Sequence, residues 1–420
     1  MSIESAAFER DEINIKRMSK VIIIGGGAAG FFTAINAKEQ NPNLDITILE
    51  KGKEVLQKVR ISGGGRCNVT HACFEPKELV KFYPRGEKEL LGPFHTFMTG
   101  DTFEWFDDRG VPLKIESDNR VFPEANTSQA IIDCFENAVD TLGIKLLKNH
   151  GVNAIEQKGN QWLVVTKNET FVADKLVVAA GSSNKAWELV ESLGHSVIEP
   201  VPSLFTFNIK DKRIIDLLGI SVPNATVNIV GTKLETSGPL LITHWGMSGP
   251  AVLKLSAFGA RILAEKGYQY NVEVNWLSRP TDKIVNVLLN LKKKQPKKQV
   301  FLKSPFAEIP RRLWERLVLA SGVTETFKWA DLSNIHIEKL ANQLTKGLYN
   351  ANGKSTFKEE FVTAGGIDLK EINFKRFESR KHDNLFFVGE MLNIDAVTGG
   401  FNFQNAWTGG FIAAKAIAED

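Results

Sequence analysis

The most constraining feature of the sequence is an apolar run followed at once by closely spaced glycines. Val21 to Ile24 are β-branched and apolar, which is typical of a buried parallel strand, and Gly25, Gly27 and Gly30 follow them. This spacing permits a tight turn and a close approach of the backbone to a pyrophosphate, which the amides at the start of the next helix can bind. The segment therefore predicts a strand–turn–helix dinucleotide site.

An acidic residue stands where such a site binds ribose. A helix is expected over residues 28–40, and the strand expected over residues 45–50 ends in Glu50. The Glu50 carboxylate can accept hydrogen bonds from both hydroxyls of an adenosine ribose, whereas it would repel a 2′-phosphate. The pattern favours FAD or NAD over NADP.

Composition excludes several other classes of protein. At 420 residues, with 43% hydrophobic and 24% charged residues, the chain is long enough for two or three domains. A net charge of +3 does not by itself indicate a nucleic-acid or membrane partner, and three cysteines cannot form a disulfide framework. No segment has the length and apolar character of a membrane span, so we expect a cytoplasmic protein. Residues 1–17 are charged, which excludes a signal peptide and predicts a disordered extension or an upstream start before Met18.

The predicted fold is α/β, with an insert that interrupts one domain. Residues 18–195 and 355–420 are expected to form a dinucleotide-binding domain, a doubly wound parallel sheet with a β-meander. Residues 196–354 are expected to form a β-rich insert, in which 281–345 have the periodicity of a small helical subdomain. The supporting strand signals are 152–157, 161–167, 170–173 and 175–181 before the insert, 204–209, 225–230, 240–243 and 268–276 within it, and 385–390 after it; helices are expected over 128–142, 248–266 and 311–320.

A second strand-to-helix motif near the end of the chain specifies the cofactor further. The apolar strand from Leu385 ends in Gly389-Glu390, and the Gly-rich segment from Thr398 opens the last helix. Such a carboxylate can bind a ribityl hydroxyl, and a positive helix N-terminus can stabilise the negative charge of a reduced flavin. Together the two motifs predict FAD rather than NAD.

Several long motifs resemble one family, the bacterial FAD-binding oxidoreductases that include the bile-acid-inducible 3-dehydro-bile-acid reductase and aminoacetone oxidase-like flavoproteins. The motifs that carry the resemblance are Gly25–Gly30, Ser62–Asn68, Arg120–Pro123, Thr243–Pro250, Val362–Ile367, Phe387–Glu390 and Thr398–Asn402. The resemblance implies a glutathione-reductase-like domain with noncovalent FAD, carrying an inserted β-barrel-like domain and a helical bundle. It also implies NAD(P)H as the electron donor and an unsaturated or ketonic small molecule as the acceptor.

The motifs and the resemblance together give a set of expected FAD contacts. The resemblance places the segment from Ser62 along the flavin and Val152 by the adenine. Phe401 stands where the family often has Tyr, so a hydroxyl contact is missing. The full set is Gly25, Gly26, Gly27, Ala28, Ala29, Gly30, Glu50, Lys51, Lys58, Ser62, Gly63, Gly64, Arg66, Cys67, Asn68, Val152, Ala180, Gly181, Gly389, Glu390, Gly400, Phe401 and Asn402.

Candidates for the chemistry itself are fewer. His244 lies between a strand and a helix start, where it could transfer a proton to substrate between the two domains; a structural hydrogen bond in an interdomain turn is the alternative. Arg60, Arg66 and Arg120 could bind pyrophosphate, stabilise reduced flavin or orient an acidic substrate, unless they are merely solvated. No spacing indicates a metal site.

The cysteines do not fit a dithiol mechanism. Cys67 and Cys73 are separated by five residues, whereas disulfide reductases place four between their sulfurs. We therefore expect Cys67 and Cys73 to be thiols without a catalytic role. Cys134 is expected to lie on a helix face that packs into the core.

The sequence is thus interpreted as an FAD-dependent oxidoreductase that moves hydride through flavin N5. Two alternatives stay open: a flavoprotein that acts on RNA or serves as a binding module, and an oxygen-using amine oxidase. The basic run from Lys292 to Lys298 gives the first alternative little support, because it lacks interleaved aromatic residues and favours a solvated loop over a nucleic-acid partner.

Overall fold

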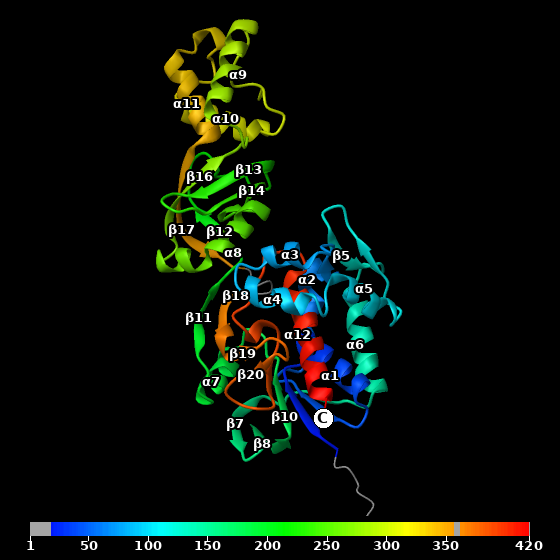
Figure 1. The fold of residues 1–420 in the computed structure, drawn as a ribbon. Coiled ribbons are helices and arrows are strands. Elements are labelled where there is room, and N and C mark those ends of the chain that lie inside the picture. Colours follow the sequence, from blue (N-terminus) through cyan, green and yellow to red (C-terminus); the bar gives the residue numbers. More distant parts are fainter. Residues whose placement is uncertain (1–17, 357–361, 420) are drawn as a thin grey trace, which may run out of the picture.

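The computed structural model describes residues 18–356 and 362–419. The extension expected over residues 1–17 lies outside the described residues. Figure 1 shows a sheet-centred body that contains both ends of the described chain, and a barrel with a cap of helices that stands beyond it. No helix among the described residues is both long and apolar enough to cross a membrane.

The central sheet is built from both ends of the chain, as the α/β prediction requires. Its seven strands have the order β19-β20-β21-β10-β1-β2-β6. The strands from β21 to β6 run parallel, and β19 and β20 add an antiparallel edge. The bounds are β1 Lys20–Ile24, β2 Asp45–Leu49, β6 Lys145–Leu147, β10 Lys175–Val178, β19 Ile372–Asn373, β20 Glu378–Ser379 and β21 Leu385–Phe387.

Two helices that are far apart in sequence pack side by side on this sheet. They are α1 (Ala28–Gln40) and α12 (Phe401–Ala418), and α6 (Gln129–Thr141) packs beside α1. Gly410 permits the close approach, because a Cβ there would lie 3.0 Å from the Thr33 hydroxyl oxygen. Helix α1 begins just after β1, and α12 follows β21 after the 3₁₀ turn at Gly389–Met391 and a loop, so their N-termini meet at the carboxyl edge of the sheet.

Smaller layers surround the sheet. The expected meander is confirmed as β7 (Val152–Lys158), β8 (Gln161–Thr166) and β9 (Thr170–Ala173). A second three-stranded sheet, β3 (Thr70–His71), β5 (Arg120–Pro123) and β4 (Leu113–Ile115), was not predicted. The remaining helices of this body are α2 (Gln57–Gly65), α3 (Pro76–Leu79), α4 (Glu87–Phe94), α5 (Thr99–Asp107) and α7 (Asn184–Ser192), with 3₁₀ turns at Val80–Phe82 (η1), Leu369–Glu371 (η3) and Gly389–Met391 (η4).

The insert forms a closed six-stranded barrel in the order β12-β15-β14-β13-β16-β17. Its strands alternate as expected for one buried face; in β16, for example, Tyr270, Val272 and Val274 are buried. The bounds are β12 Thr206–Ile209, β13 Ser221–Ile229, β14 Glu235–Ile242, β15 Gly246–Ser248, β16 Gln269–Asn275 and β17 Gly347–Ser355. Helix α8 (Pro250–Glu265) packs on β14, while α9 (Thr281–Lys294), α10 (Arg311–Ala320), the 3₁₀ turn η2 (Trp329–Asp331) and α11 (Asn334–Thr345) form the cap between β16 and β17.

The two bodies are joined by a two-stranded ribbon and by a buried ion pair. The ribbon pairs β11 (Val197–Pro202) with β18 (Thr363–Ile367). Beside it, Arg85 forms a two-pronged ion pair with Asp395, whose side chain is 0% exposed. The same guanidinium donates to the Ala257 carbonyl of α8 (2.9 Å), and the Ser203 hydroxyl donates to Asp395. One arginine therefore ties together four segments of both bodies.

We predict that Arg85→Ala lowers the free energy of unfolding by about 3–5 kcal/mol, because it leaves the Asp395 carboxylate buried without its cation. Lys81→Ala is the matched control, since Lys81 pairs with Glu78 on the surface and such pairs contribute about 0–1 kcal/mol. Urea unfolding of both variants measures the difference. Equal midpoints for the two variants would contradict the structural role of Arg85.

Candidate functional site

One large cavity opens where the carboxyl edge of the sheet faces the barrel. Its volume is about 1350 Å³, and both bodies contribute to its lining. The sheet body supplies the ends of β1, β2 and β10 and the starts of α1 and α12, and the barrel supplies residues of β12, β14 and β15. Ligand sites favour both locations, a sheet edge of this kind and a boundary between domains.

The first glycine motif shapes one end of this cavity. Gly25 has a φ of +114°, and a Cβ there would lie 2.5 Å from the Ala179 carbonyl oxygen, so only glycine fits. A Cβ on Gly27 would meet nothing within 4 Å, which leaves room for a ligand against the backbone. No side chain caps the N-terminus of α1. Its free amides and the positive end of its dipole therefore face the cavity and suit a pyrophosphate.

Glu50 is held at the same end by the backbone. One carboxylate oxygen accepts from the Gly26 amide (2.8 Å) and the other from the Gly52 amide (2.7 Å). Each oxygen keeps a second lone pair, which the ribose hydroxyls of an adenosine can use. The carboxylate is thus fixed before any ligand binds.

Charged and glycine residues line the middle of the cavity. Lys58 forms an ion pair with Glu390 and approaches the Ser182 hydroxyl (3.3 Å). Next to them, α2 contains a break: Ser62 is extended and Gly63 has a φ of +58°. This break turns the helix backbone toward the cavity, so the Ser62 segment lines it as the end of a kinked helix.

The N-terminus of α12, which also lacks a side-chain cap, closes the end of the cavity away from Glu50. Gly400 precedes α12 with a φ of +94°, and a Cβ there would lie 2.4 Å from the Thr70 carbonyl oxygen. The Asn402 side chain accepts from the Ala396 amide (3.0 Å), and so it braces the loop that leads into α12. The α12 amides are left without a side-chain cap and suit an anionic ring system.

The structure brings most of the expected cofactor residues to this one cavity. Those that line it are Gly25, Gly26, Gly27, Ala28, Ala29, Glu50, Lys51, Lys58, Ser62, Gly63, Asn68, Val152, Ala180, Gly181, Gly389, Glu390, Gly400 and Asn402. The expected residues that do not line it are Gly30, Gly64, Arg66, Cys67 and Phe401.

Packing explains why three of these residues, Gly30, Arg66 and Phe401, are set back. A Cβ on Gly30 would lie 2.1 Å from the Gly25 carbonyl oxygen, so this glycine serves helix–strand contact. Arg66 pairs with Glu116 (2.6 Å) and stacks on Phe122 instead of facing a ligand. Phe401 is buried and stacks on a neighbouring aromatic ring.

Cys67, Cys73 and Cys134 are free thiols. Cys67 is fully buried, and burial raises the pKa of its thiol to about 12. A thiol in this state is not a nucleophile at neutral pH. Cys134 is buried in α6, which confirms its expected place in the core.

His244 is placed differently from what we expected. Its residue is exposed beside Trp245 and it is not part of the cavity lining. The turn from Thr243 bends so that Ser248, four residues later, reaches the cavity in its place. Of the three candidate arginines only Arg120 lines the cavity.

Several lining residues escaped the sequence analysis. His71 comes from the unpredicted β3-β5-β4 sheet and Asp118 from the turn between β4 and β5, and Leu204, Thr206, Pro239, Leu253 and Ser355 come from the barrel or its approach. The sequence feature that could have pointed to His71 is its position close to the glycine-rich segment that ends at Asn68. Its partner strand lies 50 residues further on, so only the folded chain reveals the contact.

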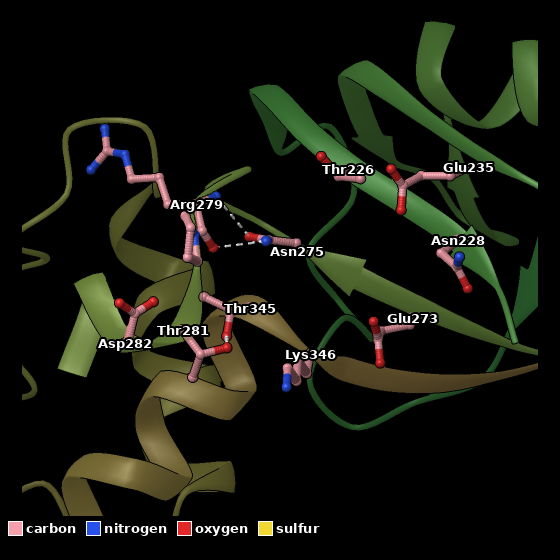
Figure 2. A pocket seen from close by; sticks show the side chains of 11 residues that line it. Thr226, Asn228, Glu235, Glu273, Asn275, Arg279, Thr281, Asp282, Thr345 and Lys346 are labelled. Atoms are coloured by element: carbon pink, nitrogen blue, oxygen red, sulfur yellow. Dashed lines mark hydrogen bonds between the residues drawn. The ribbon is translucent and has the colours of Figure 1, made fainter.

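A second hollow lies between the barrel and its helical cap. Figure 2 shows that its polar side chains come from β13, β14 and β16, the segment from Arg279 to Asp282, and the end of α11. Its volume is about 420 Å³, and the Thr281 and Thr345 hydroxyls bond to each other within it. None of its described residues is a buried polar group without a partner. It gives no indication of a bound ligand.

Metal binding has no support in the described part of the chain. Within residues 18–356 and 362–419, no three histidine, cysteine, aspartate or glutamate side chains are grouped as metal ligands.

Comparisons with known proteins agree with the dinucleotide site. A family profile described as an HI0933-like protein Rossmann domain matches residues 19–416. A 3-dehydro-bile acid delta(4,6)-reductase of Clostridium scindens is 26% identical over 415 residues, covering 96% of this chain and 100% of the relative. A ribosomal RNA dihydrouridine synthase of Haemophilus influenzae is 27% identical over 419 residues, with coverage of 96% and 100%.

Among solved structures, a 3-ketosteroid-delta4-(5alpha)-dehydrogenase of Rhodococcus jostii shares the fold. Its TM-score is 0.51 at 12% identity, and the match covers 97% of this chain and 99% of that one. At this identity the likeness describes the fold alone.

We predict that the protein binds FAD and that Glu50→Ala weakens this binding by about 1–3 kcal/mol, since the ribose hydroxyls lose a charged acceptor. This corresponds to a roughly 5- to 150-fold higher Kd, measured by quenching of FAD fluorescence. The matched control is Glu156→Ala, which removes an exposed carboxylate of β7 away from the cavity. An unchanged Kd in Glu50→Ala would contradict the assignment, as would failure of the wild-type protein to bind added FAD.

Proposed function

Because the chain belongs to the HI0933-like family of FAD-dependent oxidoreductases, we propose that it reduces a carbon–carbon double bond conjugated to a carbonyl group. The observation that carries the proposal is the single cavity into which two uncapped helix N-termini and Glu50 all point. An extended dinucleotide with an anion in its middle and a flavin at one end fits this arrangement. When bound, FAD supplies a hydride carrier at flavin N5.

The names of two relatives support the proposed acceptor. A 3-dehydro-bile acid delta(4,6)-reductase acts on double bonds conjugated to a 3-ketone. Dihydrouridine is uridine with its C5–C6 double bond saturated next to the C4 carbonyl, and a synthase that makes it reduces the same kind of system. The shared chemistry is addition of hydride to the carbon β to the carbonyl.

The barrel side of the cavity offers a group that suits the carbonyl oxygen. The Thr206 hydroxyl donates to the Ser248 oxygen (2.9 Å), and both residues line the cavity. Since that Ser248 lone pair is occupied, its own O–H remains to donate to a ligand. Pro239 and Leu253 lie beside it and keep this wall apolar, which excludes water from a reacting double bond.

We propose NAD(P)H as the electron donor. The sequence holds no second Gly-x-Gly-x-x-Gly motif after a strand, so the chain offers no dedicated nicotinamide domain. Donor and acceptor would then use the same opening in turn.

A second candidate acceptor is a uracil base within RNA, which a separate observation favours. Residues 281–345 carry 12 lysines and arginines but 6 aspartates and glutamates, whereas the whole chain has a net charge of only +3. Lys293, Lys294, Lys297 and Lys298 are exposed at the end of α9 and in the loop after it. Positive charge gathered on one subdomain favours a polyanionic partner.

We predict that NADH or NADPH bleaches the flavin absorbance of the holoprotein without oxygen, and that cyclohex-2-enone restores it. Cyclohexanone is the control, because it has the carbonyl but no conjugated double bond. A parallel arm uses ribosomal RNA and free uridine, with RNA binding measured against salt concentration. Reoxidation by RNA alone would select the second candidate. Reoxidation by cyclohexanone would overturn the proposal, as would a flavin that is bleached by amines instead of NAD(P)H and reoxidised only by oxygen.

A further inference from the structure

His71 occupies the end of the cavity where α12 begins. It is the last residue of β3 and lines the cavity next to Gly399 and Gly400. Its ring packs against Phe401, with centroids 4.5 Å apart, and against Phe82 at 5.7 Å. The two aromatic rings fix the plane of the imidazole.

A backbone contact fixes the ring proton. His71 Nδ1 lies 3.2 Å from the Gly399 carbonyl oxygen. A carbonyl oxygen only accepts, so Nδ1 carries the hydrogen and donates it. In the neutral ring the lone pair is therefore on Nε2, which is the atom that can take up or release a proton.

Several other titratable side chains that line the cavity are engaged elsewhere. Glu50 and His150 belong to the first end, where the His150 amide donates to the Glu50 carbonyl. Lys58 and Glu390 pair in the middle. At the α12 end, Asp118 pairs with Arg120 at 2.7 Å.

We propose that His71 is the acid–base residue of this protein: Nε2 holds the proton that completes reduction of the conjugated double bond. This inference rests on the proposed function. When the carbon β to the carbonyl receives a hydride, the π electrons move to the carbonyl oxygen. When they return, the carbon next to the carbonyl takes the proton from Nε2. Solvent then returns a proton to His71, so each turnover consumes one proton and one two-electron donor, NAD(P)H.

The surroundings of His71 suit a ring that takes up a proton only when negative charge arrives at this end of the cavity. Burial lowers the pKa of His71 below its ordinary value, while the Gly399 carbonyl and Asp118 raise it and Arg120 lowers it. Phe82 and Phe401 add no charge. The ring is thus neutral at pH 7 in the free protein, and negative charge arriving at this end of the cavity raises its pKa.

The test counts the protons bound when the holoprotein is reduced by two electrons. The variant is His71→Asn, whose amide keeps a donor for the Gly399 carbonyl but has no titrating nitrogen. His95→Asn is the matched control, because it removes an exposed histidine that does not line the cavity. Proton uptake is measured with a pH indicator in weak buffer during anaerobic dithionite reduction at pH 7.

We expect wild type and His95→Asn to bind one more proton per two electrons than His71→Asn. Turnover with cyclohex-2-enone should fall about 10²- to 10⁴-fold in His71→Asn, the usual contribution of a general acid, with FAD affinity unchanged. Equal proton uptake in all three proteins would overturn the role of His71. If holoprotein reduces no conjugated alkene yet the uptake differs, the proposed function fails and the assignment of the proton to His71 stands.

Discussion

The structure depends on the pairing of β21 with β10. That pairing brings a strand near the end of the chain into a parallel sheet begun by its first strand. Because β1 leads into α1 and β21 into α12, and the two helices pack against each other, their N-termini reach one edge of the sheet. The glycines of both turns, Gly25 and Gly400, are needed because the backbone there passes too close to its neighbours for any side chain. The cavity is a consequence of this arrangement.

The barrel completes the cavity without contributing to the sheet. Its position is set by the β11–β18 ribbon and by Arg85, which contacts Asp395, Ser203 and α8 together. Burial raises the pKa of Asp395, while the Arg85 charge opposes that rise. An ion pair of this kind fixes geometry more than it adds stability, since removing both partners costs far less than removing one. The wall that carries Ser248 is thereby held over the sheet edge.

The parts of the fold predicted correctly from the sequence are those whose signals are local. The apolar run at Val21, the glycines after it and the meander from Val152 each specify their own conformation within a few residues. The β3-β5-β4 sheet was missed because its strands are short and β3 pairs with β5 across about 50 residues, which no periodicity reveals. Such long separations in sequence also explain why the wrong histidine was predicted to line the cavity. His244 has a suggestive neighbourhood in sequence but lies on the surface, whereas His71 gains its position only from contacts with Gly399 and Phe401.

The division of the sheet between the two ends of the chain has a consequence for biosynthesis. The barrel strands all lie between Thr206 and Ser355, so the barrel can close while the chain is still being made. The sheet cannot, because β21 and the helix that follows it come after the barrel in the sequence. Until those last residues leave the ribosome, β10 has an open edge and one wall of the cavity does not exist. Loading of the cofactor is therefore a late event that must wait until β21 and α12 have been made.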